Sequence, residues 1–372
     1  MKIIVAGGAG DMGSRAIEVL AGAEGIDLVT IADRNLESAK QIAQRLQNKK
    51  ARVDVKYIDA NDHNSLVEAM RGYDVAASAL GPFYLFEAKL VAAAVEAGVQ
   101  YASICDDWLA ADQAVAQFSD EARKKGVMAI IGLGTSPGIS NVAVRYFAQR
   151  MDKIRRADIS VYMPLNAGGG PAVIGHTMFI MSGSVPTWRG GKRLMVPACS
   201  EARVVEFPKF GPAKLWNMGH SEPVTVPLFF PGIEEVNFFM GFGTGSSVLV
   251  WPAKMGLFGG RRRRNFFAGL LKRLEGVGKT KEPEWGAVRI DVWGTRGGKD
   301  AHEMGCGIGQ MREATGVSLA IGTLMLARKE VITKEGGVYG PEGCLDPIKF
   351  LIQLRGRGII SYFDLAMTRP II

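Results

Sequence analysis

A short glycine-rich segment at residues 8–13 constrains the fold of this chain more than any other feature. It has the pattern GxGxxG, follows an apolar run at residues 2–6 and precedes a helical pattern over 11–21. A strand, a glycine turn and a helix in this order are typical of the first unit of a dinucleotide-binding domain. The glycines permit a tight turn, contact between pyrophosphate and backbone, and close packing of helix on strand, while the helix start offers N–H groups to phosphates. The residues expected to bind a dinucleotide here are Gly8, Gly10, Asp11, Met12 and Gly13.

The first third of the chain alternates short apolar runs with helical patterns. Hydrophobic periodicity predicts strands at 2–6, 27–32, 53–58, 73–78, 100–104 and 127–131. Helices are predicted at 11–21, 35–47, 63–70, 85–97 and 110–125, with a further one at 138–150. Strands that alternate with helices pair in parallel through right-handed crossovers. We therefore expect an α/β Rossmann domain with six parallel strands in the order 3-2-1-4-5-6, and a ligand between strands 1 and 4.

The pattern changes near residue 140, and short alternating segments with frequent Gly and Pro follow. Strands are predicted at 157–163, 202–207, 222–226 and 287–294, and apolar helices at 316–327 and 346–356. This pattern favours an α+β domain with a mostly antiparallel mixed sheet. A chain of 372 residues is long for one core. We expect a Rossmann domain at 1–140, a substrate and dimerisation domain at 141–315, and a C-terminal return at 316–372 that packs on the Rossmann domain.

The ends of the predicted strands carry further candidates for cofactor binding. Asp33 follows the glycines by about 20 residues, where a carboxylate can hold the adenosine 2′-OH, and this favours NAD over NADP. Arg34 can stack on adenine or reach a 2′-phosphate, and Asp33 can instead cap the next helix. The loops after the third and fourth strands reach the same edge of the sheet, although Gly and Pro there also serve as plain turn residues. Their candidates are Asp59, Ala60, Ala79, Leu80, Gly81 and Pro82.

Five motifs, taken in order, resemble those of the saccharopine dehydrogenase family. They are GGAGDMG at 7–13, GPF at 81–83, YASICDD at 101–107, GTSPGISN at 134–141 and GVYGPE at 337–342. That family includes saccharopine reductases, lysine 6-dehydrogenases and carboxynorspermidine dehydrogenases. The resemblance covers about the first 145 residues well and the C-terminal stretch loosely. It implies a Rossmann domain, then a mixed substrate domain, then a C-terminal return.

The resemblance also implies a reaction, in which hydride passes between a nicotinamide and a C–N carbon beside an amino acid. The family's PGxxN element corresponds to Pro137, Gly138 and Asn141, whose helix start faces the nicotinamide or a substrate carboxylate. Ser136 stands where many saccharopine reductases carry an aspartate, and segments 165–195 and 251–285 differ from the lysine-pathway enzymes. The resemblance therefore indicates the cofactor better than the substrate.

Proton transfer to or from an amine needs an acid or base beside the cofactor. Asp106 and Asp107 follow the fifth strand at the ligand-binding edge, and either can exchange the amine proton or cap the next helix. His176 and His220 lie in the second domain and titrate near neutrality, although hydrogen-bonded structural histidines are more frequent. There is no HxH or HExxH pattern, so we expect no metal.

Arginine binds carboxylates in a bidentate manner, so several basic residues are candidates for holding a substrate carboxylate or, alternatively, are solvated surface charges. They are Arg189, Lys192, Arg193 and Arg296. A run of four arginines at 261–264 precedes an apolar stretch that ends at 271. Segment 261–271 can lie on an anionic membrane, cover the site as a lid, form an oligomer contact, or be a plain helix with a solvated end.

Composition excludes several classes of function. The net charge of +8 is dispersed and stands beside no nucleic-acid-binding motif, so we expect no nucleic-acid partner. The four cysteines form no CxxC pair, which argues against a zinc or redox site and favours reduced thiols in a cytoplasm. The chain opens directly on a strand without a secretory leader pattern, and its apolar runs fall short of the roughly 20 residues of a membrane span.

These observations predict an NAD(P)-dependent oxidoreductase, with NAD preferred, acting on a CH–NH or C=N bond of an amino-acid or polyamine derivative. We expect a cytoplasmic homodimer with a small-molecule substrate. One alternative is a reductase of a C=C bond in a lipid precursor. Another is a protein that binds a dinucleotide without catalysis.

Overall fold

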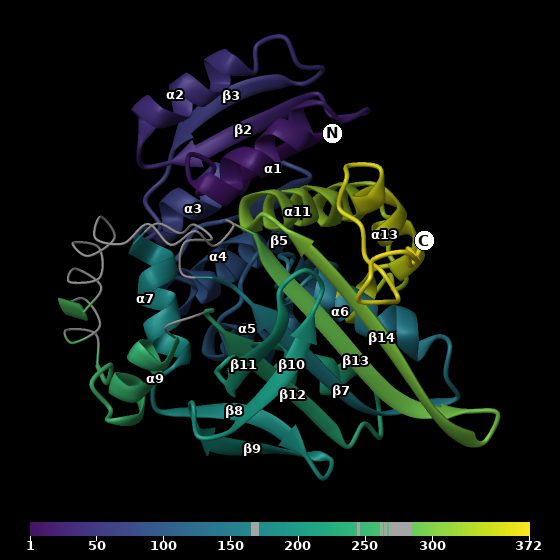
Figure 1. The fold of residues 1–372 in the computed structure, drawn as a ribbon. Coiled ribbons are helices and arrows are strands. Elements are labelled where there is room, and N and C mark those ends of the chain that lie inside the picture. The colour runs from purple at the N-terminus through teal and green to yellow at the C-terminus, as the bar shows by residue number, and fades with distance from the viewer. Residues whose placement is uncertain (165–170, 244–245, 261–262, 264–265, 268–284) are drawn as a thin grey trace. The chain divides into compact units, whose positions relative to one another are not determined.

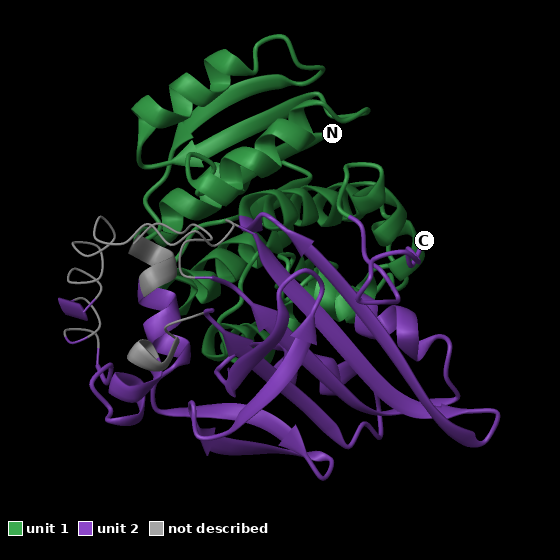
Figure 2. Cartoon of the chain, viewed as in Figure 1, with its two compact units in different colours: residues 1–142, 312–359 green, residues 143–311, 360–372 purple. Residues whose placement is uncertain are grey.

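The computed structural model describes residues 1–164, 171–243, 246–260, 263, 266–267 and 285–372. The chain forms two compact units, which Figure 2 draws in different colours. Unit 1 consists of Met1–Val142 and Arg312–Ile359, and unit 2 of Ala143–Met311 and Ile360–Ile372.

Unit 1 is built on a seven-stranded parallel sheet in the order β15-β6-β5-β4-β1-β2-β3. Figure 1 labels three of its strands, β2, β3 and β5. The strands are β1 (Lys2–Ala6), β2 (Leu28–Asp33), β3 (Arg52–Tyr57), β4 (Val75–Ser78), β5 (Gln100–Ser103), β6 (Met128–Ile130) and β15 (Gly337–Tyr339). The α/β Rossmann fold and the order of its first six strands are confirmed. The seventh strand, β15, was not predicted, because three residues beside two glycines are too few to show a period.

The helices of unit 1 are α1 (Asp11–Ala21), α2 (Leu36–Arg45), α3 (His63–Met70), α4 (Phe83–Ala97), α5 (Trp108–Lys125), α11 (Met311–Ala327), α12 (Pro341–Cys344) and α13 (Pro347–Arg355), while α6 (Ile139–Ala148) runs on into unit 2. Helices α1 to α6 and α13 begin and end within about two residues of the predicted limits, and capping groups mark several of these ends. Helix α11 begins five residues before the predicted residue 316, and α12 was not predicted. Asn35 and Asp62 accept hydrogen bonds from the first turns of α2 and α3. Gly98 and Gly126 end α4 and α5 in the left-handed conformation, with φ of 71° and 66°.

The central strands of unit 1 are mostly apolar and buried. In β1, Ile3 and Val5 are fully buried, and all four residues of β4 are buried. Helices that connect strands toward opposite edges lie on opposite faces of a parallel sheet, since the crossovers are right-handed. Both faces are therefore covered, which is why these strands appear in the sequence as continuous apolar runs.

Unit 2 holds an eight-stranded mixed sheet along the path β10-β11-β12-β7-β13-β14, with β8 joined to β12 and β9 to β8. The strands are β7 (Lys153–Tyr162), β8 (Ser184–Arg189), β9 (Lys192–Pro197), β10 (Ala202–Phe207), β11 (Gly211–Asn217), β12 (Glu235–Gly241), β13 (Gly286–Arg296) and β14 (Lys299–Gly309). Only the β12–β7 pair is parallel among the pairs described. The predicted mostly antiparallel mixed sheet is confirmed. The described helices of this unit include α7 (Pro171–Ile180), α8 (Glu222–Phe229) and α9 (Ser246–Lys254).

The predicted strand at 222–226 is wrong, because these residues form the first turns of α8. The alternation of Val224, Thr225 and Val226 with polar or proline positions suggested a strand. Pro223 occupies the first helical turn, where its missing N–H costs nothing, whereas in a central strand it would remove a ladder bond. All three residues are buried, so the helix is held by packing rather than by propensity.

A helical glycine in α11 shows how closely the C-terminal segment packs within unit 1. A Cβ added at Gly322 would lie 2.5 Å from Cδ2 of Leu133, a fully buried side chain. An added methyl group here would therefore overpack the core.

We expect Gly322→Ala to destabilise unit 1 by about 1 kcal/mol, since overpacking outweighs the gain in helix propensity. Gly22→Ala is the matched control: Gly22 ends α1 with φ of −88°, and its nearest neighbours lie at an ordinary 3.7 Å. Chemical denaturation of both variants checks this. A Gly322→Ala protein as stable as the wild type would show that Leu133 has room to move.

Candidate active site

The glycine-rich loop between β1 and α1 leaves no space for a side chain at Gly8 or Gly13. A Cβ on Gly13 would lie 2.4 Å from the carbonyl oxygen of Gly7, and one on Gly8 would lie 2.7 Å from Cδ1 of Ile17. The residue with positive φ is Gly7, at 70°, which the GxGxxG pattern does not include. The loop thus has the close backbone packing that dinucleotide binding requires.

Asp33 at the end of β2 is bonded to this loop. Its Oδ2 accepts a hydrogen bond from the N–H of Ala9 at 3.1 Å, and its Oδ1 accepts one from Asn35 at 2.9 Å. The cap of α2 is Asn35, which accepts from Ser38, so Asp33 does not serve as that helix cap. Arg34 is exposed.

The other predicted loops follow the carboxyl ends of neighbouring strands. Leu80 touches the glycine loop, since its Cα lies 2.9 Å from where a Cβ on Gly7 would stand. The N–H of Ala79 donates to Ala6 in β1 at 2.9 Å. Segment 79–82 therefore lies beside the glycine loop at the predicted switch point between β1 and β4. Asp59 instead accepts hydrogen bonds from Asn61, in a local turn before α3.

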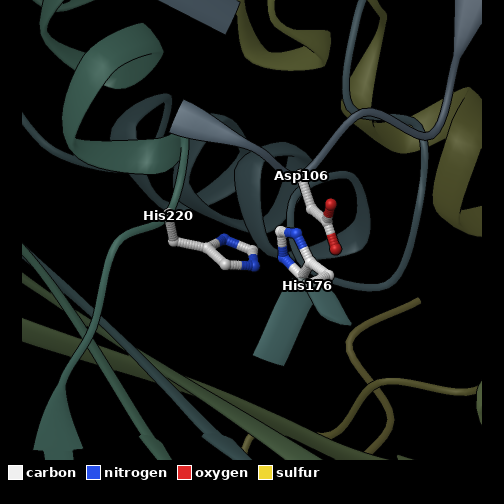
Figure 3. A group of neighbouring side chains, drawn as sticks. All are labelled: Asp106, His176 and His220. Carbon is white, nitrogen blue, oxygen red and sulfur yellow. The ribbon is translucent and has the colours of Figure 1, made fainter. Parts of the chain in front are cut away.

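The two aspartates after β5 differ in surroundings. Asp107 is fully buried and is the N-cap of α5, where its Oδ1 accepts from the N–H groups of Leu109 and Ala110 at 2.9 and 3.0 Å. Asp106 is half-buried on the same loop and is drawn in Figure 3. The structure thus shows the capping alternative for Asp107, and a catalytic role for either residue stays a prediction.

Glu87 lies in the core of unit 1, a feature that the sequence did not reveal. This α4 carboxyl is fully buried and accepts hydrogen bonds from Ser103 Oγ at 2.5 Å and Tyr101 Oη at 3.1 Å. Burial raises the pKa of Glu87 to about 7, against the lowering effect of the two hydroxyls, and the charges of Asp107 and Asp106 raise it further. The only sign of this buried carboxyl in the sequence is that Glu87 is a charged residue within a largely apolar helical segment.

Segment 132–141 is held by a buried polar pair. A Cβ on Gly138, whose φ is 126°, would lie 2.0 Å from the carbonyl oxygen of Gly134, so the turn around Pro137 requires glycine. Asn141 accepts from the N–H of Gly138 at 3.2 Å and donates to Glu342 at 2.8 Å. Asn141 and Glu342 are fully buried, so the GTSPGISN and GVYGPE motifs meet in the interior of unit 1.

Unit 2 brings together both of its candidate histidines (Figure 3). Ring nitrogens of His176, on α7, and His220 lie within 4.8 Å of each other. His220 is 5% exposed and stacks on Phe238, with ring centroids 3.9 Å apart and planes at 4°. Its Nδ1 lies 2.5 Å from Oε2 of Glu222, which is fully buried at the start of α8.

The His220–Glu222 pair has the chemistry of a proton-transfer group. A carboxylate accepts hydrogen bonds and does not donate them, so Nδ1 of His220 carries a hydrogen in this pair. The carboxylate also stabilises the imidazolium form. Sequence analysis assigned Glu222 to a strand and did not pair it with His220, although the two residues are only two positions apart.

The arginines predicted to clamp a substrate have partners within unit 2 or lie at its surface. Arg189 binds Glu201 through both terminal nitrogens, at 2.9 and 2.5 Å, which occupies the bidentate face of its guanidinium. Arg296 pairs with Glu303 and donates to the carbonyl of Arg150 at 2.8 Å, near the β13–β14 turn. Arg193 is exposed on β9. Of the arginine run, Arg263 is exposed, and residues 261, 262 and 264 lie outside the described residues.

Residues 3–130 match the family model described as the saccharopine dehydrogenase NADP binding domain. The N-terminal part of unit 1 is thus similar to a saccharopine dehydrogenase NADP-binding domain. The match confirms the resemblance inferred from the motifs and supports dinucleotide binding at the loop of this domain, without deciding between NAD and NADP.

Two curated proteins and one solved structure are similar to the chain beyond this domain. Carboxynorspermidine synthase of Vibrio cholerae is 25% identical over 239 residues, which cover 58% of this chain and 56% of the relative. The lipid droplet localized protein of Caenorhabditis elegans is 22% identical over 244 residues, or 63% of this chain and 57% of the relative. The chain thus spans just over half the length of both relatives.

The apo saccharopine dehydrogenase (L-Glu forming) of Saccharomyces cerevisiae superposes with a TM-score of 0.70 at 14% identity, covering 96% of this chain and 98% of that one. This chain therefore shares the fold of that saccharopine dehydrogenase.

Among the described residues, no helix combines the length and the apolar character needed to cross a bilayer.

We expect the buried Glu87 to make stability fall as pH rises. Its pKa is about 7 in the folded chain, against 4.5 for an ordinary glutamate in water, so the folded state favours the protonated carboxyl. Its contribution is complete below pH 4.5 and is lost as pH rises through 7, a change of about 3 kcal/mol. Urea unfolding at acidic and mildly alkaline pH should show a smaller loss in Glu87→Gln than in the wild type.

Glu96→Gln is the matched control, because Glu96 lies on the same helix but is exposed, beside His63. The stability of Glu96→Gln should depend on pH in the same way as that of the wild type over this range. Equal pH dependence in Glu87→Gln and the wild type would show that Glu87 does not hold a proton near neutrality.

Proposed function

We propose that the chain is an NAD(P)-dependent oxidoreductase that moves hydride to or from the C–N carbon of a small amine or imine derived from an amino acid or polyamine. The observation that carries this proposal is the tightly packed glycine loop of a saccharopine dehydrogenase NADP-binding domain, with segment 79–82 beside it. The names of two similar proteins, carboxynorspermidine synthase and saccharopine dehydrogenase, favour an amine-containing substrate.

Oxidation of a CH–NH bond to an imine releases a hydride and the amine proton, so the chain must bind a hydride acceptor and remove a proton. A nicotinamide supplies the hydride chemistry when bound. For the proton we favour His220, whose Nδ1 is held by the buried Glu222 and whose Nε2 accepts the amine proton. In the reverse direction the same nitrogen returns a proton to the imine. Asp106 remains a second candidate for this role.

For the cofactor we favour NAD over NADP, although the family model is named for NADP. Two backbone N–H groups, of Ala9 and Asn35, hold the carboxylate of Asp33 beside the glycine loop. A carboxylate at this position accepts from the ribose 2′-OH and repels a 2′-phosphate. Arg34 is exposed and carries the competing preference for NADP.

We expect His220→Gln and Glu222→Gln to lower turnover by about a hundredfold or more, the usual contribution of a general base. Assays would follow NADH formation with a panel of secondary amines derived from amino acids and polyamines. Dinucleotide affinity should stay unchanged, and the pH dependence of turnover should change. His302→Gln is the control, because His302 is bonded to Asp291 on the sheet of the same unit.

Unchanged turnover in both variants would exclude His220 as the base. Bound NADH without turnover on any amine would favour the non-catalytic alternative.

A lipid substrate is the second candidate function. Trp251, Met255 and Phe266 are 68%, 69% and 68% exposed, an unusual degree for large apolar side chains, and one relative is named a lipid droplet localized protein. Turnover on long-chain substrates that rises with anionic vesicles would favour this candidate.

The expected homodimer stays a prediction, which sedimentation would test.

A further inference from the structure

The first turn of α1 presents an electrostatic problem for a dinucleotide site. A helix start binds the pyrophosphate through its N–H groups and its partial positive charge. Asp11, the first residue of α1, places a carboxylate in that same turn, and its side chain is 63% exposed. A negative charge so close to the bound pyrophosphate opposes binding unless a cation compensates for it.

Arg312 supplies such a cation from the far end of the sequence. It begins the C-terminal segment of unit 1, in the first turn of α11. Its Nε lies 3.0 Å from Oδ1 of Asp11, and its Nη2 donates to Ser14 Oγ at 3.3 Å. Arg312 therefore contacts two residues of the first turns of α1, and one of them is Asp11, whose charge opposes pyrophosphate binding.

Backbone packing fixes the position of Arg312. A Cβ on Gly316 would lie 2.9 Å from the carbonyl oxygen of Met12, so α11 approaches the glycine loop as closely as a glycine permits. One residue earlier, Thr315 is hydrogen-bonded to Thr135 at 3.1 Å. The first turns of α11 thus touch both the GxGxxG loop and the GTSPGISN segment, within one unit.

The surrounding ion pairs distinguish two effects of Arg312: compensation of the Asp11 charge, and attachment of α11 to α1. Arg312 also contacts Glu18 at 3.4 Å and Glu313 at 3.3 Å. Arg15 pairs with the same two carboxylates, at 3.0 and 2.8 Å. Both arginines therefore join α1 to α11, but the described contacts of Asp11 include an ion pair only with Arg312.

We propose that Arg312 is a positioning residue of the dinucleotide site, which neutralises Asp11 so that the first turn of α1 can bind the pyrophosphate. This inference rests on the proposed function and adds α11 as a further segment of the cofactor site. It explains why the chain returns to the Rossmann unit after its substrate domain: the return delivers a cation to the phosphate-binding helix.

The test is a double-mutant cycle with NADH and NADPH as probes, read by fluorescence titration, with the melting temperature of each variant measured in parallel. Arg312→Gln should weaken both dinucleotides about tenfold, as expected when a charged partner is lost. Asp11→Asn should bind at least as tightly as the wild type. The double variant should return to within about threefold of the wild type, because the charge that Arg312 compensates is gone. The Arg312→Gln effect should shrink at high salt.

Arg15→Gln is the matched control, because it breaks ion pairs with Glu18 and Glu313 and leaves Asp11 paired. It should leave both dissociation constants unchanged. Equal weakening by Arg15→Gln and Arg312→Gln, or no rescue by Asp11→Asn, would show that the arginines only brace the helices and would overturn the inference. A wild type that binds neither dinucleotide would overturn the proposed function as well.

Discussion

The close approach of the Gly13 backbone to Gly7 is the constraint on which the rest of unit 1 depends. Because a Cβ at Gly13 would lie 2.4 Å from the Gly7 carbonyl, the loop can close only with glycine, and this closure places the start of α1 at the carboxyl edge of the sheet. Segment 79–82, Asp33 and the first turns of α11 then pack or bond against the same loop. Parts of the chain that are about 300 residues apart in sequence thus meet around one turn that only glycine can form.

Each unit also buries polar groups that a purely structural core would avoid. Unit 1 encloses Glu87 and the Asn141–Glu342 pair, and unit 2 encloses Glu222 beneath His220. A buried carboxyl destabilises the fold unless hydrogen bonds or a shifted pKa compensate. Each of these groups has such a partner, which is consistent with selection for chemistry or for holding a functional loop as well as for packing.

Sequence reasoning succeeded where a local pattern determines the structure. The GxGxxG turn, the helical periods and the continuous apolar strands each leave a signature within a few residues, and from these the strand order follows. Sequence reasoning failed where contacts between residues far apart in the sequence determine the local structure. Segment 222–226 is helical despite its β-branched residues, β15 is a strand because β6 lies beside it, and the burial of Glu87 depends on Tyr101 and Ser103. The contact of Arg312 with Asp11 joins residues that no local pattern relates.

The most direct test of the account is a titration of nucleotide-free protein with NADH and with NADPH. We expect saturable binding of both, with NADH at least tenfold tighter, a difference of about 1.4 kcal/mol, because in the proposed site the Asp33 carboxylate accepts from the ribose 2′-OH and repels a 2′-phosphate. A clear preference for NADPH would show that Arg34 outweighs Asp33. Binding of neither dinucleotide would contradict the central claim that the glycine loop of unit 1 is a nicotinamide dinucleotide site.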